Sequence, residues 1–203
     1  MTDYFALLDE PRRLWMDTER LKTKFLSRSA QVHPDKIHAA TAAARETANR
    51  SFAELNAAFN CLRDPKARLR HLLELELGAR PKEVQEIPPD LAELFGEIAR
   101  LRREVNSFLA ESARIQSALL RVQRFERAQE WVDRLRAAQK RLGDHTAGLL
   151  SELQALDAEW IRSGNDPVQR GVLLRKVEQI LQRVSFYSRW DSQFQETIVQ
   201  LTT

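Results

Sequence analysis

The sequence predicts an all-α protein built from two helical parts, and three observations support this fold class. Helix formers, chiefly Ala, Leu, Glu, Arg and Gln, dominate the 203 residues, whereas only six Gly and seven Pro occur, mostly in short clusters. Apolar residues recur at helical spacing along most of the chain. Residues 78–89 hold three of the prolines and are typical of a linker. We therefore predict an N-terminal domain at 1–77, a helical hairpin with flanking helices, and a C-terminal bundle of three long helices at 90–203.

Helix start and stop signals divide the first third of the chain. A short apolar element at residues 4–8 ends near Pro11. Asp17 is a favourable N-cap for the next helix. That helix is expected to end at about Val32, because Pro34 disfavours the helical conformation in the residue before it.

A third helix is predicted after a loop at residues 36–44. Its apolar stripe has the spacing 4, 3, 4, 3 and comprises Ala48, Phe52, Leu55, Phe59 and Leu62. We expect this stripe to pack antiparallel against Leu21 and Phe25 of the second helix. Asp64-Pro65 then favours the start of a fourth helix at 66–77, which Gly78 ends.

The second predicted helix also carries a stripe of positive charge. Arg20, Lys24 and Arg28 recur at i, i+4 and i+8, which places them on one face of the helix. Such a stripe can meet an acidic partner surface and speed the encounter.

The C-terminal part is predicted to form three antiparallel helices. The first pattern runs from Leu91 to Leu142, less regularly in its second half, and Gly143-Asp144 is expected to break it. A second helix is expected at 146–162, and the last at 167–201 after a strong stop signal. Three tryptophans are expected to pack inside this bundle: Trp131, Trp160 and Trp190.

His33-Pro34-Asp35 lies at the predicted tip of the N-terminal hairpin. Pro34 fixes one backbone dihedral and restricts its neighbour, so the tip is stiff. Asp35 then offers a carboxylate that a partner's arginine can bind bidentately. A lone tripeptide recurs by chance, but this one lies between two amphipathic helices, which favours a binding site over a simple helix end.

The tripeptide follows the segment Asp3-Tyr4-Phe5-x-Leu7-Leu8 and precedes residues 55–65. Together, these motifs over residues 3–75 resemble the J domain of DnaJ-family co-chaperones. The resemblance implies a protein that has no catalytic residue. It implies docking on a DnaK-type chaperone, whose ATP-hydrolysing state the J domain favours. The implied chaperone-binding residues are His33, Pro34, Asp35 and Lys36 at the tip, with Arg20, Lys24 and Arg28 as docking charges.

The Leu-rich extension from Arg63 to Gly78 indicates a subtype, because ordinary J domains lack it. It looks like the HscB/Jac-type co-chaperones of iron–sulfur cluster assembly, which pair a J domain with a C-terminal three-helix domain. This resemblance implies a DnaK/HscA-type chaperone as partner and an IscU-like iron–sulfur scaffold protein as client. The implied client-binding residues lie on the first bundle helix, within 91–105: Leu91, Leu94, Phe95 and Ile98. The alternative role for these side chains is bundle core.

Two features depart from that family pattern. Arg100, Arg102 and Arg103 stand where acidic residues are expected, and residues 112–141 look like an insertion. An alternative is therefore a J-domain adaptor whose bundle binds a different client or self-associates. A third hypothesis, a nucleic-acid-binding protein, rests on the basic segment 100–141, but acids interleaved with its bases favour a solvated face.

Other kinds of site are not expected, so we predict no enzyme activity, no metal and no cofactor. His33 and His38 have no cysteine beside them, and glycine-rich phosphate loops are absent. The single cysteine, Cys61, excludes an internal disulfide and is expected to be buried and inert. A signal peptide and a membrane-spanning stretch are both absent, so we expect a cytoplasmic protein with no membrane partner.

Overall fold

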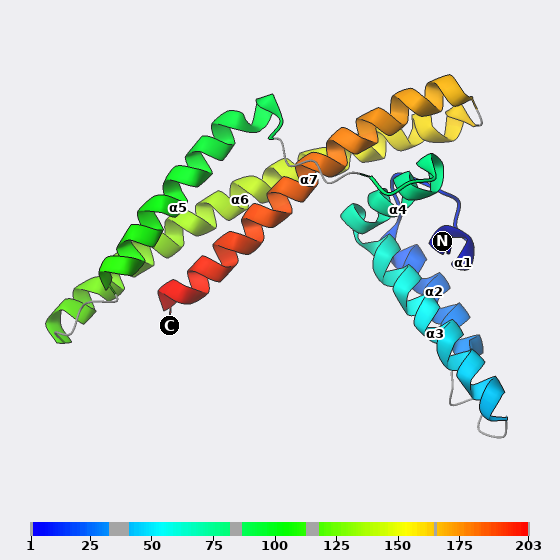
Figure 1. Cartoon of the computed structure of the whole chain (residues 1–203), viewed down its shortest axis with the longest axis horizontal. Helices are drawn as coiled ribbons and strands as arrows, with labels where there is room; N and C mark the ends of the chain where they lie inside the picture. The colour runs from blue at the N-terminus through cyan, green and yellow to red at the C-terminus, as the bar shows by residue number, and fades with distance from the viewer. Residues whose placement is uncertain (1, 33–40, 82–86, 113–117, 165, 203) are drawn as a thin grey trace. The chain divides into compact units, whose positions relative to one another are not determined.

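The computed structural model describes residues 2–32, 41–81, 87–112, 118–164 and 166–202. Its regular structure in these ranges is helical throughout, which confirms the predicted all-α class. The N-terminal helices are α1 (Tyr4–Leu7), α2 (Thr18–Val32), α3 (Ala42–Arg63) and α4 (Pro65–Leu77). A short 3-10 turn, η2 (Pro89–Leu91), precedes α5 (Ala92–Ser112), α6 (Ala118–Ser163) and α7 (Pro167–Thr202) (Figure 1).

The helices form two compact units. Unit 1 comprises Met1–Lys82 together with Leu150–Leu181, and unit 2 comprises Glu83–Leu149 together with Gln182–Thr203. The long helices α6 and α7 therefore contribute to both units. The predicted domain boundaries at 1–77 and 90–203 stay a prediction. Each unit is defined by contacts and combines segments that are far apart in the sequence, so the units do not test these boundaries.

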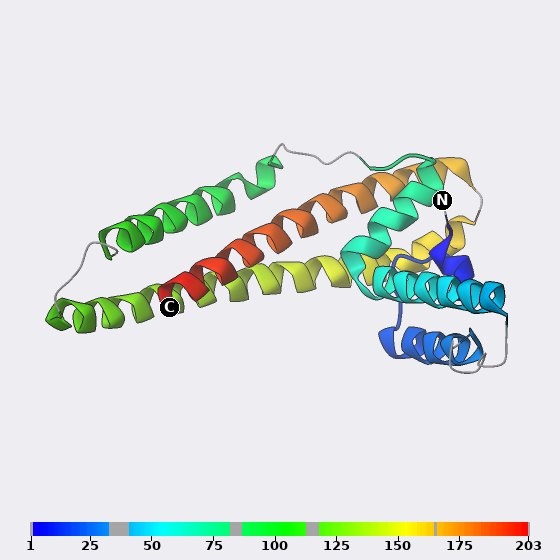
Figure 2. The same cartoon turned by 60° about the horizontal axis from the view of Figure 1, so that its bottom comes forward.

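In unit 1, α2 and α3 lie side by side and run antiparallel (Figures 1 and 2). The rings of Phe25 and Phe59 stack between them with centroids 4.5 Å apart. Leu21 of α2 and Leu55 of α3 are buried, as the stripe predicts. Phe59, however, is only half-buried, and the guanidinium of Arg63 lies 5.5 Å from its ring centroid. Phe52 is half-buried as well.

Local capping explains where these helices begin and end. Asp17 Oδ1 accepts the backbone N–H groups of Glu19 and Arg20, which starts α2. Asp64 caps α4 through Ala67 N–H at 2.8 Å. Gly78 ends α4 in the left-handed conformation with φ 69°, which glycine adopts without a steric penalty.

The short helix α1 is held against α4. Phe5 and Leu8 are fully buried, and the imidazole of His71 stacks on the Phe5 ring at 5.9 Å. The backbone N–H of Tyr4 donates to Nε2 of His71 at 3.1 Å, so this nitrogen carries no proton. Burial lowers the pKa of His71, which keeps the ring neutral at pH 7.

In unit 2, α5 packs on α6 and α7. Ile98, Val105 and Phe108 are its buried core residues. Phe108 lies 6.3 Å from the ring of Trp131 on α6. On the α6–α7 contact, the imidazole of His145 stacks on Tyr187 with centroids 5.6 Å apart.

The C-terminal helix boundaries differ from the predicted ones in two respects. The first predicted helix, 91–142, is divided between α5, which ends at Ser112, and α6, which begins at Ala118. Gly143-Asp144 does not break a helix, because α6 continues through it for 46 residues. Glycine inside a helix costs only about 1 kcal/mol, and the neighbouring Leu142 and Leu149 are buried and hold the helix in place. The helix expected at 146–162 is therefore part of α6, whereas α7 follows the predicted 167–201 closely.

Two of the three tryptophans are buried as expected. Trp160 is buried in unit 1 and Trp190 in unit 2, whereas Trp131 is half-buried. Among the described helices, none combines the length and the hydropathy needed to cross a membrane.

Candidate functional site

The predicted tip of the N-terminal hairpin lies outside the described residues. His33, Pro34, Asp35 and Lys36 follow the last residue of α2, Val32, and precede the N-cap of α3. Their role as the trigger stays a prediction, and the described part of the hairpin supplies the flanking surface.

The basic stripe on α2 meets two acidic residues in the turn after α1. Nζ of Lys24 lies 2.8 Å from Oε1 of Glu10, and Nε of Arg20 lies 3.7 Å from the same oxygen. A terminal nitrogen of Arg28 lies 3.9 Å from Oδ2 of Asp9. Because the Glu10 side chain is only 6% exposed, its carboxylate is a buried counter-charge for two of the basic residues.

The three basic residues are not equally accessible. Lys24 is 28% exposed, and its ammonium also donates to the carbonyl oxygen of Asp9. Asp9 has φ 54°, a left-handed conformation that residues other than glycine rarely adopt, so Lys24 stabilises a strained turn. Arg20 and Arg28 are 65% and 44% exposed. The accessible part of the stripe is therefore Arg20 and Arg28.

A buried carboxylate of α6 holds the segment between α1 and α2. Asp157 is 3% exposed. Its Oδ1 accepts the backbone N–H groups of Leu14 at 3.0 Å and Trp15 at 3.3 Å. Its Oδ2 accepts two N–H groups of the Arg13 guanidinium. One side chain thus satisfies donors from three consecutive residues.

Two further side chains fix the same segment. The indole N–H of Trp160 donates to the carbonyl oxygen of Arg12 at 2.7 Å. The buried guanidinium of Arg68 donates to the carbonyl oxygens of Leu62 at 2.7 Å and Leu14 at 3.3 Å. Burial lowers the pKa of Arg68 to about 10, so this side chain still carries its charge at pH 7. The turn that supplies Glu10 to the basic stripe is therefore anchored immediately after it, at residues 12–15.

Sequence reasoning missed this anchor, although one signal for it exists. Asp157 lies between Leu156 and Trp160, among the residues that α6 buries. A carboxylate on the apolar face of a helix is costly unless it has partners, so its position indicates a buried polar contact. Nothing in the sequence indicates that the partners are 143 residues away, at Leu14.

The four predicted client-binding residues, of which Leu91 lies in η2 and the others in α5, differ in how far they are exposed. Leu91 and Ile98 are buried, 5% and 4% exposed. Leu94 is half-buried and lines a shallow pocket between α5 and α6, together with Leu101 and Leu142. Phe95 is 39% exposed and lies against Trp190 of α7, with ring centroids 6.1 Å apart. Only Leu94 and Phe95 therefore offer apolar surface to a partner in this conformation.

The described residues contain no group of three or more His, Cys, Asp or Glu side chains arranged to bind a metal ion. Cys61 is half-buried, somewhat less than predicted. Burial raises the pKa of its thiol to about 11, so the reactive thiolate is scarce at pH 7.

The proteins that this chain is similar to include a curated relative and two solved structures of HscB co-chaperones, while no protein-family model matches. The relative, named "Co-chaperone protein HscB homolog", is from Bordetella pertussis. It is 32% identical over 127 residues, which is 60% of this chain and 74% of the relative. The chaperone HscB from Vibrio cholerae superposes with a TM-score of 0.65 and 20% identity over 98% of this chain and 99% of that one. Human co-chaperone protein HscB superposes with a TM-score of 0.57 and 20% identity, covering 96% and 81% respectively. At this identity the two structures show the shared fold.

Proposed function

The chain belongs to the HscB family of co-chaperones, and we propose that it stimulates ATP hydrolysis by a DnaK/HscA-type chaperone while delivering an iron–sulfur scaffold protein as client. One observation supports the chaperone half of this proposal most directly. The helix that leads into His33-Pro34-Asp35 presents Arg20 and Arg28 to solvent on one face, while Glu10 and Lys24 stabilise the turn beside them.

This surface acts by docking and not by chemistry on a substrate. Exposed guanidinium groups attract an acidic partner surface, raise the association rate and fix the orientation of the complex. In this proposal, the tip predicted from the sequence offers Asp35 to the partner, where a bidentate contact with an arginine favours one chaperone state over another. The chemical step belongs to the chaperone, and the co-chaperone shifts its conformational equilibrium.

The client half of the proposal rests on α5. Phe95 is an exposed aromatic side chain whose ring contacts the ring of Trp190 on α7. Leu94 adds apolar surface at the pocket between α5 and α6. Rigid aromatic anchors of this kind often carry much of the binding energy of a protein interface. Leu91 and Ile98 contribute from within, because their burial fixes the position of α5.

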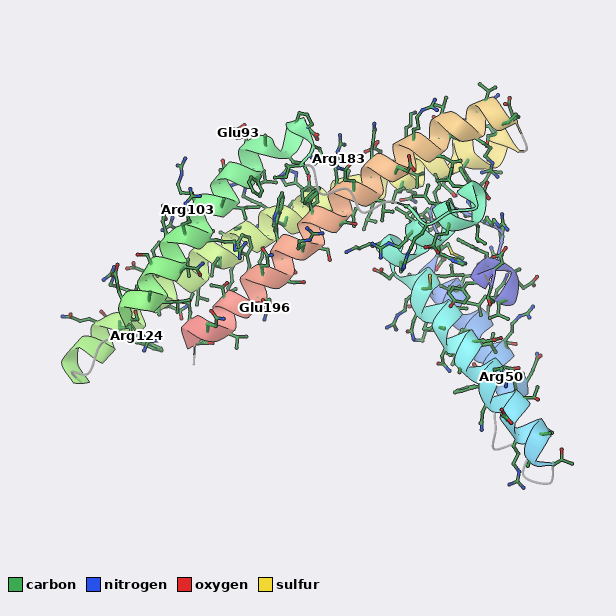
Figure 3. The ribbon with its side chains drawn as sticks, in the orientation of Figure 1. Arg50, Glu93, Arg103, Arg124, Arg183 and Glu196 are labelled. Carbon is green, nitrogen blue, oxygen red and sulfur yellow. The ribbon has the colours of Figure 1, made fainter. Side chains whose placement is uncertain are left out.

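The docking proposal is tested with matched charge variants of one hairpin. Arg20→Ala and Arg28→Ala remove accessible charges from α2, whereas Arg50→Ala removes an exposed charge from α3 (Figure 3). We expect each α2 variant to raise the concentration needed for half-maximal ATPase stimulation several-fold at low salt, with a smaller difference at high salt. Arg50→Ala should behave like the wild type. Equal effects of the α2 and α3 variants would show that total charge matters and that the stripe is not the docking surface.

A further inference from the structure

Three arginines on α5 have no acidic partner among the described residues. Arg100, Arg102 and Arg103 are all exposed. Figure 3 shows Arg103 on the side of α5 that faces away from α6 and α7. An exposed arginine that no acid neutralises keeps its full capacity to bind an anionic group.

The acids beside these arginines in sequence are turned toward α6. Oε2 of Glu104 lies 2.9 Å from a guanidinium nitrogen of Arg134, and Oε2 of Glu97 lies 2.9 Å from one of Arg141. The mixed charge of the sequence is thus separated in the fold. One flank of α5 holds carboxylates paired with α6, and Arg100 shares that face by its i+3 and i−4 spacing, whereas Arg102 and Arg103 lie away from it.

Arg102 and Arg103 continue the surface that begins at Phe95. Arg102 follows Phe95 by seven residues, which is two helical turns and places both side chains on the same flank of α5. Arg103 is the next residue, toward the outer side. A partly exposed aromatic ring therefore lies in line with cationic groups, a combination in which protein interfaces are enriched.

We propose that this flank of α5 binds an acidic surface of the client scaffold, with Phe95 as the apolar anchor and Arg102 and Arg103 as the residues that select for charge. The inference rests on the proposed client-binding role of α5 and specifies the kind of surface the client must have. A protein partner is favoured over a nucleic acid because the aromatic anchor supplies apolar contact area.

The test is titration calorimetry of the full chain with the organism's own IscU-like scaffold at low and high salt. The variant Arg102→Glu/Arg103→Glu reverses both charges. Its matched control, Arg175→Glu/Lys176→Glu, makes the same change in net charge at two exposed positions of α7 in unit 1. We expect the α5 variant to weaken scaffold binding at least about tenfold at low salt, with a clearly smaller loss at high salt. The α7 control should stay within about twofold of the wild type, since surface changes away from an interface have small effects.

The possible failures are distinguishable. Scaffold binding that is unchanged or tighter in Arg102→Glu/Arg103→Glu would overturn the acidic-surface inference and leave the client assignment intact. Absence of binding by the wild type would overturn the proposed client itself, and the inference with it. A 20-base-pair DNA duplex serves as the probe for the alternative that the arginines bind nucleic acid. The contrary result is that the wild type binds that duplex while Arg102→Glu/Arg103→Glu does not, with scaffold binding unchanged in the variant. That result would assign the arginines to nucleic-acid binding and overturn the inference.

Discussion

Asp157→Ala should destabilise unit 1 by a measurable amount, because it removes the acceptor for four N–H groups from three residues at once. The N–H of Leu14 loses a 3.0 Å hydrogen bond, and Leu14 is fully buried. A buried donor left unsatisfied costs about 1–3 kcal/mol. The Trp15 bond is longer, at 3.3 Å, and its loss adds less.

The Arg13 guanidinium contributes little to this sum. Its side chain is 34% exposed and can be hydrated once the carboxylate is gone. Removing Asp157 also relieves the cost of burying a charge, which offsets part of the loss. We therefore expect a decrease of about 2–3 kcal/mol in the free energy of unfolding for Asp157→Ala. Asp157→Asn should cost about half as much, because its amide oxygen can still accept the Leu14 N–H.

The assay is urea unfolding combined with amide hydrogen exchange over residues 12–15. Exchange reports on the anchor locally, so it remains informative if the two units unfold separately. Glu159→Ala is the matched control, since it removes a carboxylate from the same helix at an exposed position and should change stability by less than about 0.5 kcal/mol. If Asp157→Ala matched this control in both stability and exchange at Leu14, the anchor would be energetically irrelevant and our reasoning would fail.

Three further predictions test the fold. Phe59→Ala should lower the free energy of unfolding, measured in urea, by about 2 kcal/mol. This is less than the 3–5 kcal/mol typical of a fully buried Phe, because the ring is half-buried. A loss under about 0.5 kcal/mol would contradict the stacking of Phe59 on Phe25 of α2. Burial lowers the pKa of His71 in the folded state, so the unfolded chain binds a proton more readily, and stability should fall as the pH drops below the unfolded value of about 6.5. His71→Phe should flatten that slope between pH 7 and 5.5, and an unchanged slope would exclude His71 as its source. Gly143→Ala should raise the melting temperature, because alanine favours a helix and the added methyl group meets no atom within 4 Å inside α6. Gly78→Ala should lower the melting temperature, because φ at this residue is +69°. Equal shifts for the two variants would contradict the helix boundaries.

Much of unit 1 is predictable because its signals are local. The caps at Asp17 and Asp64 and the left-handed Gly78 each act within four residues, and the structure uses all three. The apolar stripe of α3 identified the face that packs on α2. It overstated the burial of Phe52 and Phe59, because periodicity gives the direction of a side chain and not how completely a partner covers it.

The course of α6 illustrates where local reasoning fails. Gly143 has poor helix propensity, yet the buried Leu142 and Leu149 on either side of it outweigh that local penalty. Local propensity is a weak guide wherever tertiary packing opposes it.

For the candidate sites, spacing alone placed Arg20, Lys24 and Arg28 on one face. It could not separate the half-buried Lys24 from its exposed neighbours, because the distinction depends on Glu10, which lies in the turn after α1. The anchor at Asp157 and the separation of charge on α5 depend equally on side chains that are distant in sequence. Polar contacts of this kind follow from the fold and not from any pattern within one helix.

The most direct test of the co-chaperone assignment is single-turnover ATP hydrolysis by the organism's own DnaK/HscA-type chaperone, with the full chain added as wild type or as His33→Gln. We predict that the wild type accelerates hydrolysis and that His33→Gln abolishes the acceleration. Circular dichroism should show a stability change under about 0.5 kcal/mol, because the sequence predicts an exposed position for His33. Equal acceleration by His33→Gln, or no acceleration by the wild type, would contradict the claim that this chain works through a J domain.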